Sequence, residues 1–271
     1  MEKMADKSKT WGEGYIKGTE FEGYSYFLNI SKIINENHQI SFTGFGAPQW
    51  HNQRFNGDKL LISEWEKLKD GYKFNPTYGY DANGQRKTGN YNYYHKPQLS
   101  LNHFWTINEK SSLSTAAYMS IGNGGGYSWR GNSNSYLYGT NSATGKLNET
   151  YRTVDGYMDY GKLQKENAEN PNGSQAVITS SRNNHNWVGL LSTYNTRLLD
   201  IIDFTAGLDL RYYAGLHDAY IVDLMGGKFY IDPSRANVKY SNSAGNLAYI
   251  NQHLKEGDIV YRDNTGYVAL S

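Results

Sequence analysis

The unequal spacing of its candidate β-strands constrains this chain more than any other feature. Three pairs of strands with alternating apolar and polar residues are each closed by a short turn, and long polar stretches separate the pairs. The turns fall at 35–38, 108–112 and 199–202, and the long stretches run over 48–97, 123–186 and from 214 onward. Short links on one side of a sheet and long links on the other are typical of outer-membrane β-barrels, whose turns face the periplasm and whose loops face the exterior.

The alternation predicts six long antiparallel strands in an up-and-down meander, and so an all-β chain. They span residues 23–34, 39–47, 98–107, 113–122, 187–198 and 203–213. Strands of about ten residues suit a tilted path across a membrane, whereas strands in soluble proteins average about 5–6 residues.

Each predicted strand has one apolar and one polar face, although Phe27 breaks the pattern in the first strand. The face expected to meet lipid carries Leu28, Ile30, Ile40, Phe42, Leu99, Leu101, Met119, Ile121, Leu208 and Leu210. The face expected to meet a watery interior carries Asn29, Ser41, Thr43, Ser100, Asn102, Thr193, Asn195, Asp209 and Arg211. A charged pair in mid-strand, Asp209 and Arg211, is what a water-filled interior would allow.

Composition narrows the classes of function. The 271 residues include no Cys, which excludes disulfides and Cys-based zinc or iron–sulfur sites. The net charge of +1 gives no electrostatic basis for binding nucleic acid. A mean hydropathy of −0.73 is compatible with a barrel, because only alternate strand residues meet lipid and the loops are hydrophilic.

The long stretches hold the candidate ligand-binding residues. The first contains Trp50, His51, Asn52, Gln53 and Arg54, followed by a short helix expected near 62–69. The second contains Trp129, Arg130, Tyr136 and Tyr138, and also Tyr151 and Arg152. Unstructured loops of this length are usually functional, and aromatic, amide and Arg side chains at a barrel mouth suit a sugar, a chelate or a peptide.

No arrangement of residues predicts catalysis, so we expect the chain not to be an enzyme. Glu64 and Glu66 are two residues apart in the expected helix and do not face each other. Asp155 and Asp159 have no His nearby in the sequence, and the seven His residues show no metal-ligand spacing. We therefore expect no catalytic residue, no metal and no cofactor.

Five segments carry a resemblance to a known family. Residues 18–32 (GTEFEGYSYFLNISK) and 38–54 (HQISFTGFGAPQWHNQR) resemble the barrel of TonB-dependent outer-membrane receptors, as do 92–105 (NYYHKPQLSLNHFW), 207–213 (GLDLRYY) and 230–235 (YIDPSR). The resemblance covers most of the chain from about residue 14 and is closest to receptors of gut-type Gram-negative bacteria. It implies a segment of a roughly 22-stranded barrel around an N-terminal plug. It also implies that the receptor imports a scarce nutrient, namely an iron chelate, cobalamin, an oligosaccharide or a peptide.

The resemblance sets the expected domains and partners. Residues 14–271 would be a partial receptor barrel in the outer membrane, and residues 1–13 a flexible or non-native segment. Met1–Lys9 is charged and has no apolar core, unlike a secretory signal, so we expect a piece of a longer protein. Its partners would be outer-membrane lipid, the remaining barrel strands and plug, the TonB complex acting through that plug, and a small nutrient. The alternative is a secreted, soluble β-sandwich that binds carbohydrate, which requires a second sheet packed on the apolar face.

Overall fold

The chain is organised around one large antiparallel sheet, as the alternation predicts. The computed structural model describes residues 1–54, 60–132, 140–141, 144–199, 201–232, 238–241, 247–250 and 253–271. Ten strands form the sheet: β1 (Glu2–Gly12), β2 (Phe21–Asn35), β3 (His38–Gly46), β4 (Gln49–Asn52), β7 (Tyr91–His95), β8 (Gln98–Asn108), β9 (Ser111–Gly131), β13 (Ala176–Leu198), β14 (Ile202–Asp223) and β17 (Ile259–Leu270).

The sheet is an up-and-down meander. β3 and β4 form one interrupted path across it, and β7 and β8 form the next, so each path pairs with its neighbours in chain order. The interruptions contain Pro48 and Pro97, which have no backbone N–H to donate to a ladder. The order across the sheet is therefore β1, β2, β3/β4, β7/β8, β9, β13, β14 and β17.

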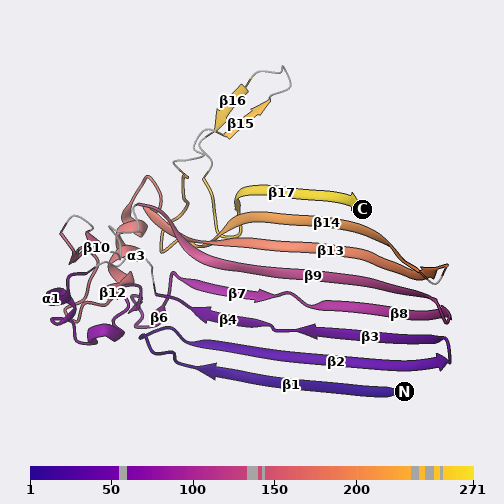
Figure 1. Cartoon of the computed structure of the whole chain (residues 1–271). Helices are drawn as coiled ribbons and strands as arrows, with labels where there is room; N and C mark the ends of the chain where they lie inside the picture. The colour runs from indigo at the N-terminus through magenta and orange to yellow at the C-terminus, as the bar shows by residue number, and fades with distance from the viewer. Residues whose placement is uncertain are drawn as a thin grey trace.

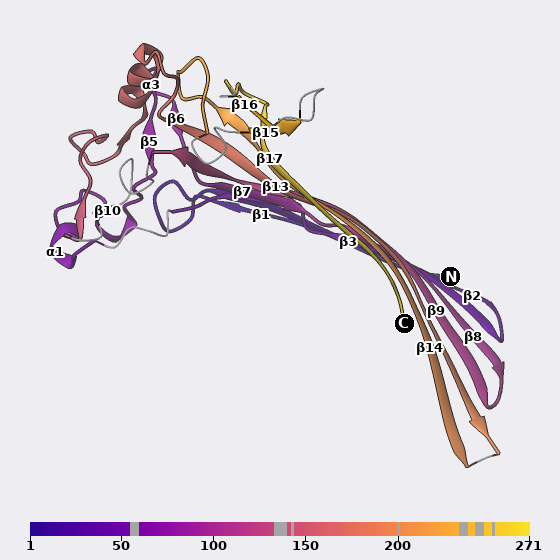
Figure 2. The ribbon, with the colours of Figure 1, turned by 90° about the horizontal axis from the view of Figure 1, so that it is seen from above.

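Short turns and long connections lie at opposite ends of the sheet (Figure 1). The three predicted hairpins are confirmed as β2–β3, β8–β9 and β13–β14. At the other end, which we call the loop end, the long connections gather with the helices (Figures 1 and 2). The unequal spacing in the sequence therefore corresponds to two different rims of one sheet.

The sheet is larger than the sequence predicts. β9, β13 and β14 have 21, 23 and 22 residues, because each continues well beyond the predicted end toward the loops. The segment 1–13, expected to be flexible, contains β1, which pairs with β2 from Glu2 opposite Ser31 to Gly12 opposite Phe21. At the other edge, β17 pairs with β14.

Strand register places the predicted apolar residues on one face. One row across the sheet contains Ile30, Phe42, Leu101, Ala117, Leu190, Leu210 and Leu270. The neighbouring row on the opposite face contains Asn29, Thr43, Ser100, Tyr118, Gly189, Arg211 and Ala269. All ten residues of the expected lipid face share the first side, here called the apolar face, and all nine of the expected interior face share the second, here called the polar face.

No second sheet covers the apolar face in the part of the chain that the structure describes. Leu101 and Ile121 are 52% and 55% exposed, respectively. Figure 2 shows the turn-side part of the sheet as a single curved layer. The second layer that the soluble sandwich requires is therefore not seen here, and no helix in the described residues is long and apolar enough to span a membrane.

The small elements of the described residues lie at the loop end (Figure 1). They are α1 (Ile62–Trp65), the 3₁₀ turn η1 (Gly71–Lys73), α3 (Tyr160–Glu169), β5 (Gly79–Tyr80), β6 (Arg86–Lys87), β10 (Thr140–Asn141), β11 (Lys146–Leu147), β12 (Met158–Asp159), β15 (Val238–Ser241) and β16 (Leu247–Ile250). Asp159 caps α3 by accepting a hydrogen bond from the Lys162 backbone N–H. Of the helix expected over 62–69, α1 forms only the first part.

Two compact cores hold the loop end together. In the first, Trp129 stacks on Tyr160 and packs with Leu163 of α3. The second is built from Val177, Ile221, Leu224, Tyr230, Leu254 and Val260. These are the buried apolar clusters of the described chain, so the loop end is a folded unit rather than a set of separate loops.

Candidate functional site

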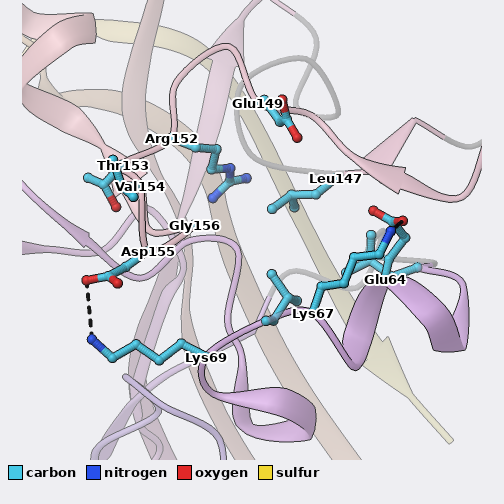
Figure 3. A pocket seen from close by; sticks show the side chains of 12 residues that line it. Glu64, Lys67, Lys69, Leu147, Glu149, Arg152, Thr153, Val154, Asp155 and Gly156 are labelled. Carbon is cyan, nitrogen blue, oxygen red and sulfur yellow. Dashed lines mark hydrogen bonds and ion pairs between the residues drawn. The ribbon is translucent and has the colours of Figure 1, made fainter.

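A cavity of about 700 Å³ opens at the loop end between α1 and the segment 147–156 (Figure 3). Its apolar lining comes from Leu60, Leu68, Leu147 and Val154. Its charged lining comes from Glu64, Lys67, Lys69, Glu149, Arg152 and Asp155. The volume lies within the range of small-ligand sites.

Main-chain contacts fix the two walls of this cavity. The backbone N–H of Leu61, just before α1, donates to the carbonyl of Gly145 at 2.9 Å. Gly156 closes a turn by donating to the Thr153 carbonyl and has a φ of 84°, which favours glycine. A Cβ at Gly156 would lie 3.5 Å from Leu68 and 3.7 Å from Phe74, so the turn packs on the wall that follows α1.

Four of the charged groups form ion pairs inside the lining. Lys67 Nζ lies 2.6 Å from Glu64 Oε1, and Lys69 Nζ lies 3.3 Å from Asp155 Oδ2. The second pair joins the two walls, as the dashed line in Figure 3 shows. Because these lysines are well exposed, each pair contributes little to stability.

Arg152 is the central cation of the cavity. Its Nε donates to the Asn148 carbonyl at 3.2 Å, and its Nη1 donates to the Pro76 carbonyl. Figure 3 shows its guanidinium directed between the two walls. Burial lowers the pKa of Arg152 to about 10, so it remains charged at neutral pH.

The exposed carboxylate of Glu149 lines the same cavity. In the described residues it forms no hydrogen bond and no ion pair. The cavity therefore combines a guanidinium held by main-chain carbonyls with one exposed carboxylate beside an apolar lining.

The predicted residues of the first long stretch lie apart from this cavity. Trp50, His51 and Asn52 belong to β4 and pair with β2 and β7, rather than extending from a loop. They line a second cavity of about 490 Å³ beside Phe21 and Tyr24. These three residues are therefore part of the sheet, whereas the sequence interpretation places them in a loop.

Asn52 belongs to a polar cluster that joins the β1–β2 connection to β6. Its side-chain amide donates to Glu20 Oε2 at 3.0 Å, and Arg86 contacts both Glu20 carboxylate oxygens. Burial alone would raise the pKa of Glu20, but the hydrogen bonds from Arg86 and Asn52 outweigh burial and hold the pKa below its usual value. This cluster supports the strand rather than presenting free groups to a ligand.

Gln53 and Arg54 follow β4. The Gln53 amide lies 3.1 Å from His51 Nε2. The Arg54 guanidinium lies 5.4 Å from the ring centroid of Trp65 at the end of α1, and Trp65 packs edge-on against Phe74. Arg54 therefore contacts Trp65, and neither residue lines the first cavity.

Trp129 and Arg130 both make contacts that hold the loop end together. Trp129 is 5% exposed and belongs to the first core. Arg130 Nε lies 3.2 Å from Asp232 Oδ2, and its guanidinium lies 5.8 Å from the ring of Tyr261. The structure therefore does not join them to Trp50–Arg54 in one site, and Tyr136 and Tyr138 lie outside the described residues.

The sequence interpretation missed Glu149, and it named Arg152 only as one of several residues of the second long stretch. Nothing in their spacing marks them, because the cavity joins segments about 90 residues apart in the chain. In the described part of the chain, no group of three His, Cys, Asp or Glu side chains is arranged to hold a metal ion. Comparison with family models and with curated proteins gives no match to this chain.

Proposed function

We propose that this chain is part of the wall of an outer-membrane β-barrel of the TonB-dependent receptor type, which takes up a scarce nutrient. One observation carries the proposal: strand register gathers ten apolar residues on one face, and in the described part of the chain no second sheet covers them. In water such a surface is unfavourable, whereas lipid would cover it without a second sheet.

Aromatic residues border the apolar rows in the way that a membrane interface favours. Toward the turns, Trp105 and Tyr194 lie in one row on the apolar face, on either side of Leu113. Toward the loops, Tyr24 and Tyr26 lie on the same face and are 44% and 38% exposed. Rings with a polar tip are enriched at both interfaces of membrane barrels.

The two edges of the sheet support a wall that further strands complete. In the described residues β1 pairs only with β2, and β17 pairs only with β14, so each has one unpaired edge. Unpaired backbone groups are very costly in lipid. The proposal therefore includes further strands beside both edges.

The receptor part of the proposal rests on the loop end. Its two cavities open where the long connections gather, on the rim opposite the short turns. In outer-membrane barrels the rim with long loops faces the exterior. The nutrient would therefore meet these cavities before it reached the barrel interior.

The test compares two adjacent residues of β8 that the register places on opposite faces. Leu101→Cys and Asn102→Cys each introduce the one Cys of the chain, since the natural sequence has none. Each variant is labelled with an environment-sensitive dye and folded into phosphatidylcholine vesicles that contain a nitroxide-labelled lipid. The proposal predicts strong quenching and a blue shift at position 101 and little of either at 102.

A charge substitution gives an independent readout of the same arrangement. Leu101→Arg should reduce the stability of the lipid-inserted chain by about 2–4 kcal/mol, because the side chain would enter the apolar layer. Asn102→Arg should cost much less, because it faces water. Equal quenching at both positions, or equal costs, would refute the proposed orientation.

A further inference from the structure

We propose that His38 and His103 form a two-point binding site for a divalent transition-metal ion, such as Cu²⁺, on the apolar face. The two residues lie on the adjacent strands β3 and β8, toward the rim of short turns (Figure 1). This inference goes beyond the proposed function, because it depends on strand register and side-chain contacts and needs neither lipid nor a nutrient.

Strand register brings the two imidazoles together. Ile40 and His103 are register partners on the apolar face. His38 lies two residues from Ile40 on β3, so it takes the diagonal position beside His103 on the same face. Aromatic and long side chains at diagonal positions of an antiparallel pair reach each other. The pair joins residues 65 apart in the sequence, so the spacing of histidines along the chain does not reveal it.

The ring nitrogens are already positioned as a pair. His38 Nδ1 and His103 Nε2 lie 2.9 Å apart and share one hydrogen bond. The two rings are parallel to within 2° and their centroids are 5.2 Å apart, so these nitrogens point at each other. Trp105 stacks on the His38 ring, with centroids 5.4 Å apart, and so restricts that ring. Both imidazoles are half-buried, which leaves the pair open to water.

The separation of the two nitrogens suits adjacent ligands of one metal ion. Imidazole nitrogen binds zinc at about 2.0–2.1 Å, so two such ligands at right angles lie about 2.9 Å apart. Each ring would turn about its last side-chain torsion, which is broad in His, to direct its lone pair at the ion. The shared proton would move to the outer nitrogen of its own ring, so both rings stay neutral. Water would complete the coordination, because the described residues contain no group of three metal-ligating side chains.

The surroundings favour a metal that prefers imidazole ligands. The other five histidines of the chain contact different kinds of side chain, namely Tyr26 with His95, Gln53 with His51, Ser120 with His185, Asn183 with His217 and Phe229 with His253. Lys32 of β2 lies on the same face as the pair, opposite Ile40, and its flexible stem lets its ammonium group turn toward solvent. Imidazole suits Cu²⁺, Ni²⁺ and Zn²⁺, whereas Mg²⁺ and Ca²⁺ require oxygen ligands.

The experiment titrates the full chain in detergent micelles with Cu²⁺ held as its iminodiacetate complex. This chelate leaves two adjacent coordination positions open, so a histidine pair binds it more tightly than a single histidine does. Calorimetry should detect one tight site, and the electron paramagnetic resonance spectrum should show two coordinated imidazole nitrogens. The tight site should also raise the urea midpoint of the chain, because the unfolded chain does not hold the two histidines together. Mg²⁺ should do neither.

Single substitutions test whether the two histidines act together. His38→Gln and His103→Gln should each weaken the tight site about 100-fold, since a second linked ligand raises affinity by about 10²–10⁴. The double variant should bind no more weakly than either single variant, because each substitution alone already removes the chelate. His217→Gln is the matched control and should change nothing, since His217 is also a strand residue but contacts Asn183 in place of a second histidine.

The outcomes decide this inference separately from the proposed function. A spectrum with one imidazole nitrogen, or equal losses for His38→Gln, His103→Gln and His217→Gln, would overturn the metal site even if the dye at position 101 reports lipid. Two nitrogens and the selective losses would support the site even if that dye reports water. If a substitution impairs folding, the number of nitrogens bound in the natural chain still decides the matter.

Discussion

The side chain of Tyr118 in β9 lies across Gly189 of the neighbouring strand β13. The two residues are register partners on the polar face, and a Cβ at Gly189 would lie 2.3 Å from both Cζ and the hydroxyl oxygen of Tyr118. The Tyr118 ring also packs edge-on against Trp187, with ring centroids 6.0 Å apart. The glycine provides the space that this aromatic contact needs.

Gly189→Ala should destabilise the sheet by about 1–3 kcal/mol, because the methyl group would displace Tyr118. Gly207→Ala is the matched control, since a Cβ there would meet only the Ser192 carbonyl at 3.8 Å. It should be neutral or slightly stabilising. Urea unfolding of the full chain in detergent micelles measures both effects, and equal losses would show that Tyr118 does not depend on Gly189.

Two Arg–Asp pairs join β13 to β14 in contrasting environments. At the loop end, Asp218 is fully buried and contacts Arg182 through both carboxylate oxygens at 2.6 Å. At the turn, Arg197 and Asp203 lie 3.9 Å apart, with side chains 55% and 86% exposed. The carboxylate is therefore buried in the first pair and exposed to solvent in the second.

Asp218→Asn should reduce the free energy of unfolding by about 2–3 kcal/mol, because it leaves a guanidinium opposite a neutral group. Arg182 keeps a side-chain exposure of 31%, so the loss should be smaller than for a fully buried pair. Asp203→Asn should have little effect, since solvent screens the exposed pair. Denaturant titration distinguishes the two, and a larger loss for Asp203→Asn would contradict the burial argument.

Glu20 should make stability depend on pH. Its folded pKa lies below its usual value, so its contribution is complete above the unfolded pKa of about 4.3 and is lost as the pH falls through the lowered folded pKa. Glu20→Gln should therefore lower stability at pH 7 and reduce the further loss between pH 5 and pH 3. Urea midpoints at these three pH values test this, and parallel curves for variant and wild type would exclude the linkage.

The edge strand β1 carries more charge on the apolar face than its neighbour β2 does. Lys3, Lys7 and Lys9 share the apolar face with Ile30 and Tyr26 of β2. Their positive charges make this part of the apolar face more soluble and oppose association between copies of the chain in water. Replacing all three lysines with Leu should speed aggregation in detergent-free buffer, as light scattering would show, whereas replacing Lys228 and Lys255 should not.

Alternation was sufficient to predict the faces and the three hairpins. Residues such as Leu101 and Asn102 repeat with a period of two, and each turn directly follows its strand, so the signal is local. β1 was not predicted, because apolar and polar residues alternate only weakly along it. The extension of β9 past Gly122 was not predicted, because a run of glycines normally ends a strand. Here, however, Tyr93 and Tyr94 of β7 pair with Gly125 and Gly124.

The candidate site was less predictable, because it depends on contacts between distant segments. Trp129 was selected as a ligand-binding candidate in a long loop, yet it packs between Gly89 and Tyr160, which lie 40 and 31 residues away in the sequence. Arg152 and Lys69 reach one cavity only after the loop end has folded. Composition identifies residues that can bind a ligand, but not which of them the cores will bury.

The two proline interruptions lie side by side in the sheet. Ladder pairing stops between Phe45–Gln98 and Gln49–Tyr94, and the gap between these pairs contains Pro48 and Pro97. β2 and β9 run past this gap without interruption on either side. The sheet therefore has fewer cross-strand hydrogen bonds along this short line, which favours local bending between the loop end and the apolar rows.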